Sequence, residues 1–283
     1  MRPRAASLLG YDEAARLILI NCDDFGMAPE VTSAALAALR AGTATSATLI
    51  VPATWAADAA AQSRGEPIGV HLTMNSEWES DRWRPLTQAP SLCDPDGSLC
   101  RHPEDTCARA VAAEVRAELR AQIEQAIAWG LEPTHLDAHM YLVQERWDFF
   151  DIYLDLATEY ALPVRVSGSA RQVDHPFRVR AHQRGVVCPD YLVRLDRVGS
   201  REPLVAALAD LPPGLTEFHL HPAVDSPALR QLASDWPGRT DDRELLASPE
   251  FWQLVADSKA TVVGYRELRD AARAVNPDVS QTD

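Results

Sequence analysis

The sequence predicts an α/β fold, built as a single-domain (β/α) barrel, and three observations carry this prediction. Short continuous runs of Val, Ile and Leu alternate along the chain with helical patterns, as expected for parallel strands covered on both faces. Asp and His residues stand where several of these runs end, and barrels carry their catalytic groups at the carboxyl ends of their strands. The length of 283 residues suits one barrel, although an open doubly wound sheet would show the same alternation.

The strands are predicted from short apolar segments that are bounded by polar or turn-forming residues. In chain order the expected strands are Leu17–Cys22, Ala47–Val51, Ile68–Leu72, Thr134–Ala138, Pro163–Val166, Val186–Cys188, Leu215–His221 and Thr261–Tyr265. This number of strands, alternating with helices, fits a (β/α) barrel or a doubly wound sheet, and the polar residues at the carboxyl ends of the strands favour the barrel.

The helices are predicted from their end signals and their apolar spacing. Pro29 suits a first helical turn and Gly42 suits a helix end, so a helix is expected over Val31–Arg40. Over Ala110–Trp129 apolar residues recur at every fourth position, and the charged residues between them, Glu118 included, are expected to face solvent. Further helices are expected over Trp147–Tyr160, Leu204–Ala209, Pro249–Asp257 and Arg266–Val275.

Composition excludes several classes of partner. The formal charge of −14 leaves no basic stripe that could displace counterions from nucleic acid, so no nucleic-acid partner is expected. No apolar run approaches the roughly 20 residues of a membrane span or forms a signal-peptide core, so we expect a cytoplasmic protein without a membrane partner. A homodimer is an allowed assembly. One domain is expected over residues 1–275, followed by a disordered tail at 276–283.

The cysteines are expected to be free thiols. Their number is five, and no two of them form a Cys-x-x-Cys pair. Cys93, Cys100 and Cys107 recur every seven residues, but structural zinc sites favour tighter pairs of ligands. Free thiols also agree with a reducing compartment.

The pair Asp23–Asp24, directly after the strand Leu17–Cys22, points to a metal site. Adjacent carboxylates repel each other, and burying either one is costly unless a cation or a proton holds it. His71 and His139 stand at the ends of two other expected strands. One carboxylate and two imidazoles suit zinc, or another divalent ion such as magnesium. We therefore expect Asp24, His71 and His139 to bind one divalent ion, with Asp23 as a general base.

Other histidines lie near the same strand ends. His219 and His221 share one face of a strand, and either could protonate a leaving group or stabilise an oxyanion. His135 and Asp137 share a face with His139 if the segment is extended, and orientation of the ligands is their expected role. His219 is expected to support the site residues beside them. Taken singly, each of these residues is more often structural. Their coincidence at several strand ends favours function.

The segment Thr73–Pro103 is long for a compact domain and directly follows His71, which is typical of a functional loop. It contains Trp78 and Trp83. Their indole rings could stack on a sugar in the site, or they could anchor the loop on the barrel by burying a large apolar area. The sequence alone leaves both interpretations open.

Four motifs together resemble the YdjC-like carbohydrate deacetylases, also described as the ChbG/HpnK group. They are Asn21-Cys-Asp-Asp-Phe-Gly26, Gly69-Val-His-Leu72, Pro133-Thr-His-Leu-Asp-Ala-His139 and His221-Pro222. Their order and spacing match over nearly the whole chain. The resemblance implies a modified TIM-like (β/α) barrel, a divalent metal, and hydrolysis of the N-acetyl group of an acetylated sugar or oligosaccharide with release of acetate.

The resemblance also implies roles for single residues. Asp24, His71 and His139 match the metal ligands of the family. Asp23 matches its catalytic base, and His221 matches the histidine that acts as general acid. A small carbohydrate is the implied substrate. Trp78, Trp83 and Arg165 are expected to contact this substrate. Of the three, Arg165 stands where the family often has a basic residue beside the pocket.

Two departures from the family pattern bear on the substrate. Relatives often carry further histidines where this chain has Met140-Tyr-Leu-Val143, and Ala223 replaces a common glycine. Both departures bear on the choice of sugar and leave the expected metal ligands and base unchanged. Two alternatives stay open: another metal-dependent hydrolase of amides, esters or phosphoesters on this barrel, and a catalytically silent carbohydrate-binding protein.

Overall fold

A computed structural model describes residues 5–167, 175–195 and 200–275 of the chain. Its strands are β1 (Arg16–Phe25), β2 (Ser46–Leu49), β3 (Ile68–Leu72), β4 (Leu136–Ala138), β5 (Tyr191–Arg194), β6 (Gly214–Leu220) and β7 (Thr261–Val262). Its helices are α1 (Ala5–Leu8), α2 (Pro29–Ala41), α3 (Ala56–Gln62), α4 (Pro103–Arg109), α5 (Ala112–Ala128), α6 (Trp147–Glu159), α7 (Pro176–Gln183), α8 (Arg201–Ala209), α9 (Pro227–Leu232), α10 (Trp236–Ala247), α11 (Pro249–Ser258) and α12 (Tyr265–Val275), with short 3₁₀ turns at Pro90–Leu92 and His139–Gln144. The tail expected to be disordered, 276–283, lies outside the described residues.

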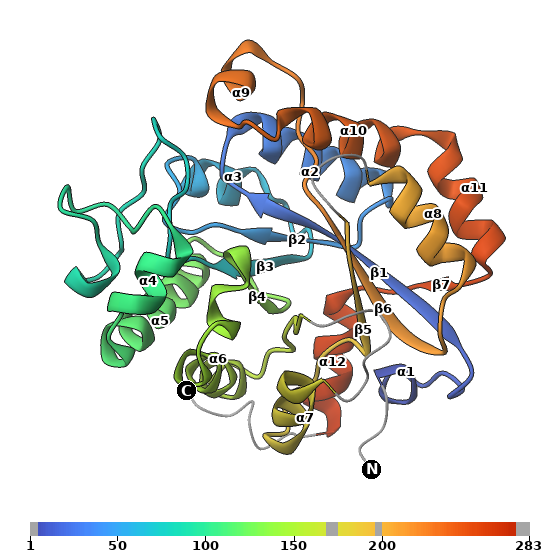
Figure 1. Cartoon of the computed structure of the whole chain (residues 1–283). Coiled ribbons are helices and arrows are strands. Elements are labelled where there is room, and N and C mark those ends of the chain that lie inside the picture. The colour runs from blue at the N-terminus through green and yellow to red at the C-terminus, as the bar shows by residue number, and fades with distance from the viewer. Residues whose placement is uncertain (1–4, 168–174, 196–199, 276–283) are drawn as a thin grey trace.

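The strands form one parallel sheet in the order β4-β3-β2-β1-β6-β5, with helices packed around it (Figure 1). Strand β1 is central. It pairs with β6 along most of its length, while β2 and β7 share its other edge, β7 beside Leu17 and β2 from Asn21 onward. Because all strands run parallel, their carboxyl ends lie together at the same end of the sheet.

The open side of the sheet is bridged by irregular backbone. The segments Pro163–Val166 and Val186–Cys188, expected as strands, form only an isolated bridge between Leu136 and Val164 and a bond from the N–H of Val164 to the carbonyl of Val187. Their assignment as strands was wrong, because Pro163 has no N–H to donate and each segment is too short to continue a ladder. The barrel expectation is confirmed in a modified form, a curved parallel sheet with an irregular closure.

Strand β5 (Tyr191–Arg194) was not predicted, because its apolar run is only three residues long and charged residues flank it. Several helices were not predicted either, among them the polar helix α10. By contrast, β3 and α6 lie where they were expected. Helix α2 begins at Pro29 and ends at Ala41, and Gly42 caps it in a left-handed conformation with φ 77°.

Helix α5 corrects one expectation about charge. The helix turns about 100° per residue, so residues four apart drift around its axis, and the two ends of the expected apolar stripe, Val111 and Ile127, are 51% and 44% exposed. Glu118, expected to face solvent, is fully buried. It accepts hydrogen bonds from the backbone of Leu86 and Thr87, so the helix uses a carboxylate to fasten a loop.

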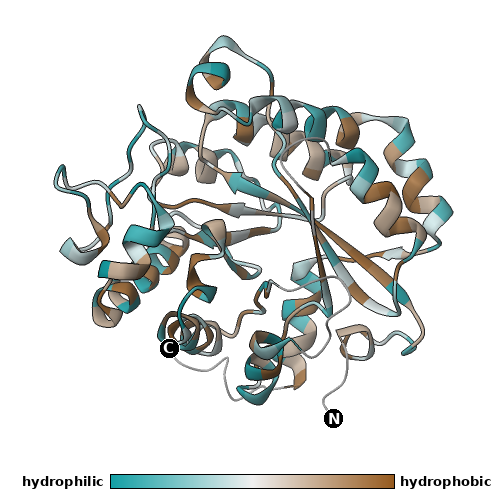
Figure 2. Ribbon diagram, in the orientation of Figure 1, coloured by the Kyte–Doolittle hydropathy of each residue, from teal (hydrophilic) through white to brown (hydrophobic). Residues whose placement is uncertain are grey.

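The apolar residues lie along the strands and on the inner faces of the helices. In Figure 2 strand β1 is hydrophobic along its body and becomes hydrophilic at its carboxyl end, where Asp23 and Asp24 lie. Among the helices that the structure describes, none combines the length and the apolar character needed to cross a bilayer.

Candidate active site

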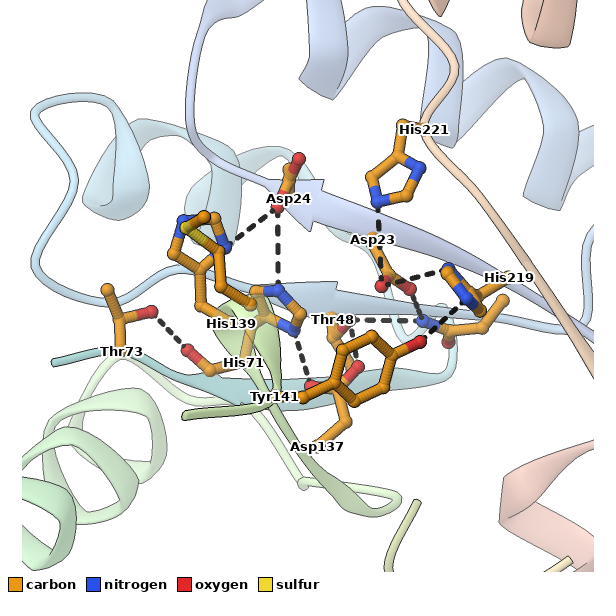
Figure 3. A network of polar contacts seen from close by, with 12 residues as sticks. Asp23, Asp24, Thr48, His71, Thr73, Asp137, His139, Tyr141, His219 and His221 are labelled. Carbon is orange, nitrogen blue, oxygen red and sulfur yellow. Dashed lines mark hydrogen bonds and ion pairs between the residues drawn. The ribbon is translucent and has the colours of Figure 1, made fainter. Parts of the chain in front are cut away.

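The carboxyl ends of four strands bring the expected site residues together (Figure 3). Asp23 and Asp24 end β1, His71 lies on β3, His139 directly follows β4, and the pair His219 and His221 lies at the end of β6. A cavity of about 390 Å³ opens between them, lined by Asp23, Asp24, His71, Ala138, His139, Met140, Tyr141, Leu195, His219 and His221. The strand ends thus gather into one polar hollow.

Asp24, His71 and His139 converge around one point. The Oδ1 atom of Asp24 lies 3.4 Å from Nε2 of His71 and 3.4 Å from Nδ1 of His139, and all three side chains are buried. Oδ1 accepts no hydrogen bond from the described residues, whereas Oδ2 accepts one from Arg239 at 2.8 Å. A buried carboxylate oxygen that faces two ring nitrogens, each too far for a short hydrogen bond, fits a divalent cation.

Carboxylates hold the outer sides of both imidazoles. Nδ1 of His71 lies 2.6 Å from Asp137, and Nε2 of His139 lies 2.9 Å from Glu77. Histidines that bind metals usually donate their second N–H to a carboxylate in this way, which fixes the tautomer. The remaining nitrogens, Nε2 of His71 and Nδ1 of His139, are therefore the ones available to an ion.

Two other groups of potential ligands lie nearby, Asp23 with His219 and His221, and Asp23 with His71 and Asp137. Both depend on Asp23, whose two oxygens are bonded to the guanidinium of Arg165 at 2.6 and 2.7 Å. A cation would have to compete with that fixed positive charge. Among the described residues, the Asp24 group is therefore the better metal site.

Asp23 is held as an ionised carboxylate. Burial alone would raise its pKa, but the adjacent Arg165 and His219 hold the pKa of Asp23 well below its usual range. Arg165 is fully enclosed and also contacts Glu217 and Asp137, each at 2.8 Å. The sequence placed Arg165 beside the substrate. The structure instead places it beneath Asp23 and outside the residues that line the cavity.

His219 and His221 both lie close to Asp23, on different sides of its carboxylate (Figure 3). Nδ1 of His219 lies 3.6 Å and Nε2 of His221 lies 3.8 Å from Oδ2 of Asp23. Nε2 of His219 also lies 2.7 Å from the hydroxyl of Tyr141, whose backbone has the unusual φ of 58°. His221 faces the cavity without such a contact to Tyr141.

Of the two residues expected to orient the ligands, only Asp137 contacts one. His135 stacks on Tyr265 with ring centroids 3.6 Å apart, deep in the barrel. Burial and the nearby Arg165 lower the pKa of His135 well below its ordinary value, so it is neutral. Its place is structural.

Trp78 and Trp83 are only 6% and 2% exposed, and neither lines the cavity. Their rings lie 6.2 Å apart, and Trp83 lies 6.1 Å from the ring of His139. This burial favours the anchoring interpretation over direct stacking on a sugar. Contact of either indole with substrate stays a prediction, which the following variant tests.

Trp78→Ala is accordingly expected to lower the free energy of unfolding by about 3 kcal/mol, because a large buried side chain leaves a cavity. The KM for substrate should change little. Urea unfolding and steady-state kinetics measure both quantities, with Trp55→Ala, at a 42% exposed tryptophan, as the control. A raised KM with unchanged stability would restore the stacking interpretation.

Several contacts of the site could not be read from the sequence. Arg239 and Asp242 lie on α10, and Asp242 accepts the backbone N–H of His221 at 2.8 Å. Arg239 and Asp24 are 215 residues apart, so no local spacing relates them. For Glu77 the only signal was its place in the long loop after His71.

Metal binding at this site is expected to release protons. Burial disfavours the charged form of both histidines, but Asp137 raises the pKa of His71 to about 10, and Glu77 with Asp24 raises the pKa of His139 to about 9. Both imidazoles therefore carry two protons at neutral pH without metal, and an ion must displace one from each. Metal affinity should rise with pH by roughly tenfold per unit for each proton released.

Calorimetry in buffers of different ionisation enthalpy measures this release. The same shifts set the stability of the metal-free protein, because both folded-state pKa values lie above the ordinary 6.5. The charged histidines contribute fully to the free energy of unfolding below pH 6.5, the ordinary pKa of histidine. This contribution is lost as the pH rises through about 9 to 10, the folded-state pKa values of His139 and His71. Metal binding at neutral pH without proton release would mean that His71 and His139 are already neutral in the metal-free protein, whereas unchanged affinity after replacing either histidine would contradict their assignment as ligands.

The sequence is similar to that of a known protein family over most of its length. The family model described as YdjC-like protein matches residues 17–257. A protein of Thermus thermophilus named carbohydrate deacetylase is 37% identical over 263 residues, covering 90% of this chain and 95% of the relative. A protein of the same name from Brevibacillus brevis is 30% identical over 260 residues, covering 89% of this chain and 99% of the relative.

The fold recurs in a solved structure. The crystal structure of a protein of Enterococcus faecalis V583, described there as a candidate cellobiose-phosphate cleavage protein, has a TM-score of 0.79 and 25% identity, covering 90% of this chain and 99% of that chain. The matched residues of the family model include every residue that lines the cavity. With most of its length and its whole candidate site inside that match, the chain belongs to the YdjC-like protein family.

Proposed function

We propose that this protein is a metal-dependent carbohydrate deacetylase, which hydrolyses the N-acetyl group of a sugar and releases acetate. One observation carries the proposal: the group Asp24, His71 and His139 and the pair Asp23 and His221 face each other across one cavity. The names of the relatives from Thermus thermophilus and Brevibacillus brevis support the reaction and the substrate class.

One divalent ion would be held by Oδ1 of Asp24, Nε2 of His71 and Nδ1 of His139. When bound, such an ion polarises a carbonyl oxygen and makes a water molecule more acidic. Two imidazoles and one carboxylate favour zinc or a similar transition ion over magnesium, which prefers oxygen ligands. Magnesium and other divalent ions belong in the test.

The proton transfers are assigned to the chain's own residues. Asp23 accepts a proton from the attacking water, which adds to the acetyl carbonyl carbon. Arg165 keeps Asp23 ionised and oriented through two hydrogen bonds, so the base is always present at neutral pH. Burial lowers the pKa of His221, so at neutral pH it is neutral at rest and first takes up the proton that Asp23 received from the water, across the 3.8 Å between Oδ2 of Asp23 and Nε2 of His221. His221 then gives this proton to the amine nitrogen as the C–N bond breaks, which yields acetate and the free amine. His219, bound to Tyr141, is the alternative proton donor.

The cavity suits a small carbohydrate. Its volume of about 390 Å³ lies near the lower end of the range of ligand pockets. Of the positions where relatives often carry histidine, Met140 and Tyr141 line the cavity, and Val143 is buried. We infer that Met140 and Tyr141 adjust the choice of sugar while the metal site and the base remain intact.

Acetate release tests the proposal directly. The protein is loaded with zinc, magnesium or another divalent ion and assayed on N-acetylated mono- and oligosaccharides, with a phosphorylated disaccharide included because of the description of the Enterococcus relative. Metal-dependent acetate release is expected from at least one sugar. Hydrolysis of esters or phosphoesters alone would favour another hydrolase, and sugar binding without turnover would favour a silent binding protein. The cytoplasmic location and the homodimer stay predictions, which fractionation and light scattering test.

A further inference from the structure

The loop between β3 and α4, residues 73–102, takes part in the metal site although none of the proposed ligands lies in it. Glu77 accepts a hydrogen bond from Nε2 of His139 at 2.9 Å, and its side chain is only 19% exposed. The proposed chemistry uses His139 as a ligand and leaves Glu77 without a part in any step. This contact therefore calls for an explanation of its own.

Helix α5 fastens the outer side of this loop with three polar residues on one face. Gln122 bonds both the N–H and the carbonyl of Thr73, at 2.9 and 2.7 Å. Glu118 accepts the N–H groups of Leu86 and Thr87, and Glu114 accepts the N–H and hydroxyl of Ser91 at 2.8 and 2.7 Å. Since these bonds span the loop from its start to its middle, its docked position is well determined.

The inner side of the loop contacts the segment around His139. The N–H of Trp83 donates to Ser76 at 3.0 Å, which folds the loop back beside Glu77. Asn75 lies 3.0 Å from the sulfur of Met140, the residue after the ligand. The loop thus contacts the segment around His139 in three ways. Glu77 bonds the ring of His139, the ring of Trp83 lies beside it, and Asn75 contacts Met140, the next residue in the chain.

We propose that Glu77 is a positioning residue of the metal site, and that docking of the 73–102 loop and binding of the ion stabilise each other. The inference rests on the metal site of the proposed function and not on its substrate. By accepting the Nε2 hydrogen of His139, Glu77 keeps Nδ1 aimed at Asp24, so that Nδ1 is the nitrogen that can bind the ion once its own proton has left. Its negative charge also favours a cation nearby. Orientation of Nδ1 and attraction of the cation both favour binding, so removing Glu77 is expected to weaken it.

Coupling between two events is reciprocal. If the docked loop raises the affinity for the ion through Glu77, then the ion must stabilise the docked loop by the same factor. Metal should therefore slow the local opening of residues 73–102, and Glu77 should be needed for that effect.

The first test compares zinc affinity by chelator competition in the unchanged full chain and three variants. Glu77→Ala is expected to weaken zinc binding by about 10–100-fold. Glu77→Gln, whose amide oxygen can accept the same hydrogen but carries no charge, should lose less. Glu79→Gln is the matched control. This substitution removes the same charge from the same loop, but at a side chain that is 85% exposed. Equal affinities for Glu77→Ala and Glu79→Gln would overturn the proposal.

The second test measures hydrogen exchange of the loop amides with and without zinc. Zinc should slow exchange at Thr73, Leu86, Thr87 and Ser91 in the unchanged protein, and the slowing should be smaller in Glu77→Gln, which keeps the shape of the side chain if the alanine variant folds poorly. No effect of zinc on these amides in the unchanged protein would overturn the coupling. Neither test uses a substrate, so a failed deacetylase assay and a failed coupling are distinguishable.

Discussion

Replacing Asp23 with asparagine is expected to lower turnover by about 10²–10⁴-fold, the usual contribution of a general base. Asparagine has nearly the same shape and can still accept a hydrogen bond from Arg165, but it cannot take a proton from water. Asp24, His71 and His139 are untouched, so metal content should be unchanged. Initial rates of acetate release and metal analysis of the same preparation measure the two effects separately.

The matched control is Asp58→Asn on the exposed side of α3, where the side chain bonds only Gln62 among the described contacts. It should leave turnover at the level of the unchanged protein. Normal turnover of Asp23→Asn would place the base elsewhere, with His219 the next candidate. Loss of metal from Asp23→Asn would mean instead that Asp23 belongs to the coordination sphere.

Replacing Arg165 with methionine is expected to lower the free energy of unfolding at neutral pH by about 3–5 kcal/mol, the usual loss when one partner of a buried ion pair is removed. Arg165 contacts the carboxylates of Asp23, Asp137 and Glu217 inside the barrel, and methionine would leave all three without their shared cation. Turnover should fall as well, because Asp23 would lose both its orientation and the charge that keeps it ionised.

The pH dependence separates this cause from simple loss of packing. Without Arg165 the pKa values of the enclosed carboxylates rise, so at lower pH they take up protons and the electrostatic cost of the variant shrinks. The difference in unfolding free energy from the unchanged protein should therefore be largest near neutral pH and smaller at acidic pH. A difference that is constant with pH would point to packing alone.

Two further variants complete this experiment. Arg165→Lys keeps the charge but cannot bond three carboxylates with one planar fork, so an intermediate loss of stability is expected. Arg230→Met removes a surface pair with Asp225 and should change stability little. Stability of Arg165→Met equal to that of Arg230→Met would show that the buried network contributes nothing.

Strands that consist of a short apolar run, and the residues at their ends, could be predicted from the sequence. Strand β3 was expected over Ile68–Leu72 and lies there. A short, mostly apolar segment is a local signal of a buried strand, so it can be recognised without knowledge of the rest of the fold. The candidate ligands followed from the same pattern. Asp24, His71 and His139 all stand at strand ends, and parallel strands bring their carboxyl ends to one face of the sheet. A local signal and one topological rule were enough to gather them.

The two tryptophans show where a local signal becomes ambiguous. An indole buries a large area whether it packs on a barrel or stacks on a sugar, so Trp78 and Trp83 satisfy both interpretations in the sequence. Only their burial in the folded chain favours packing. Similarly, the period of α5 could not show that Glu118 faces a loop instead of solvent, since its partners lie over 30 residues away.

The sequence by itself determined the alternating fold, the strand ends that carry Asp and His, and the family to which they are similar. The tertiary structure alone decided which charge neutralises which: Arg239 of α10 holds Asp24, Arg165 holds Asp23, and Glu77 of the loop holds His139. The reason is physical. Burial patterns repeat along the chain and can be read locally, whereas the partner of a buried charge is whichever group folding brings within about 3 Å, however distant in sequence.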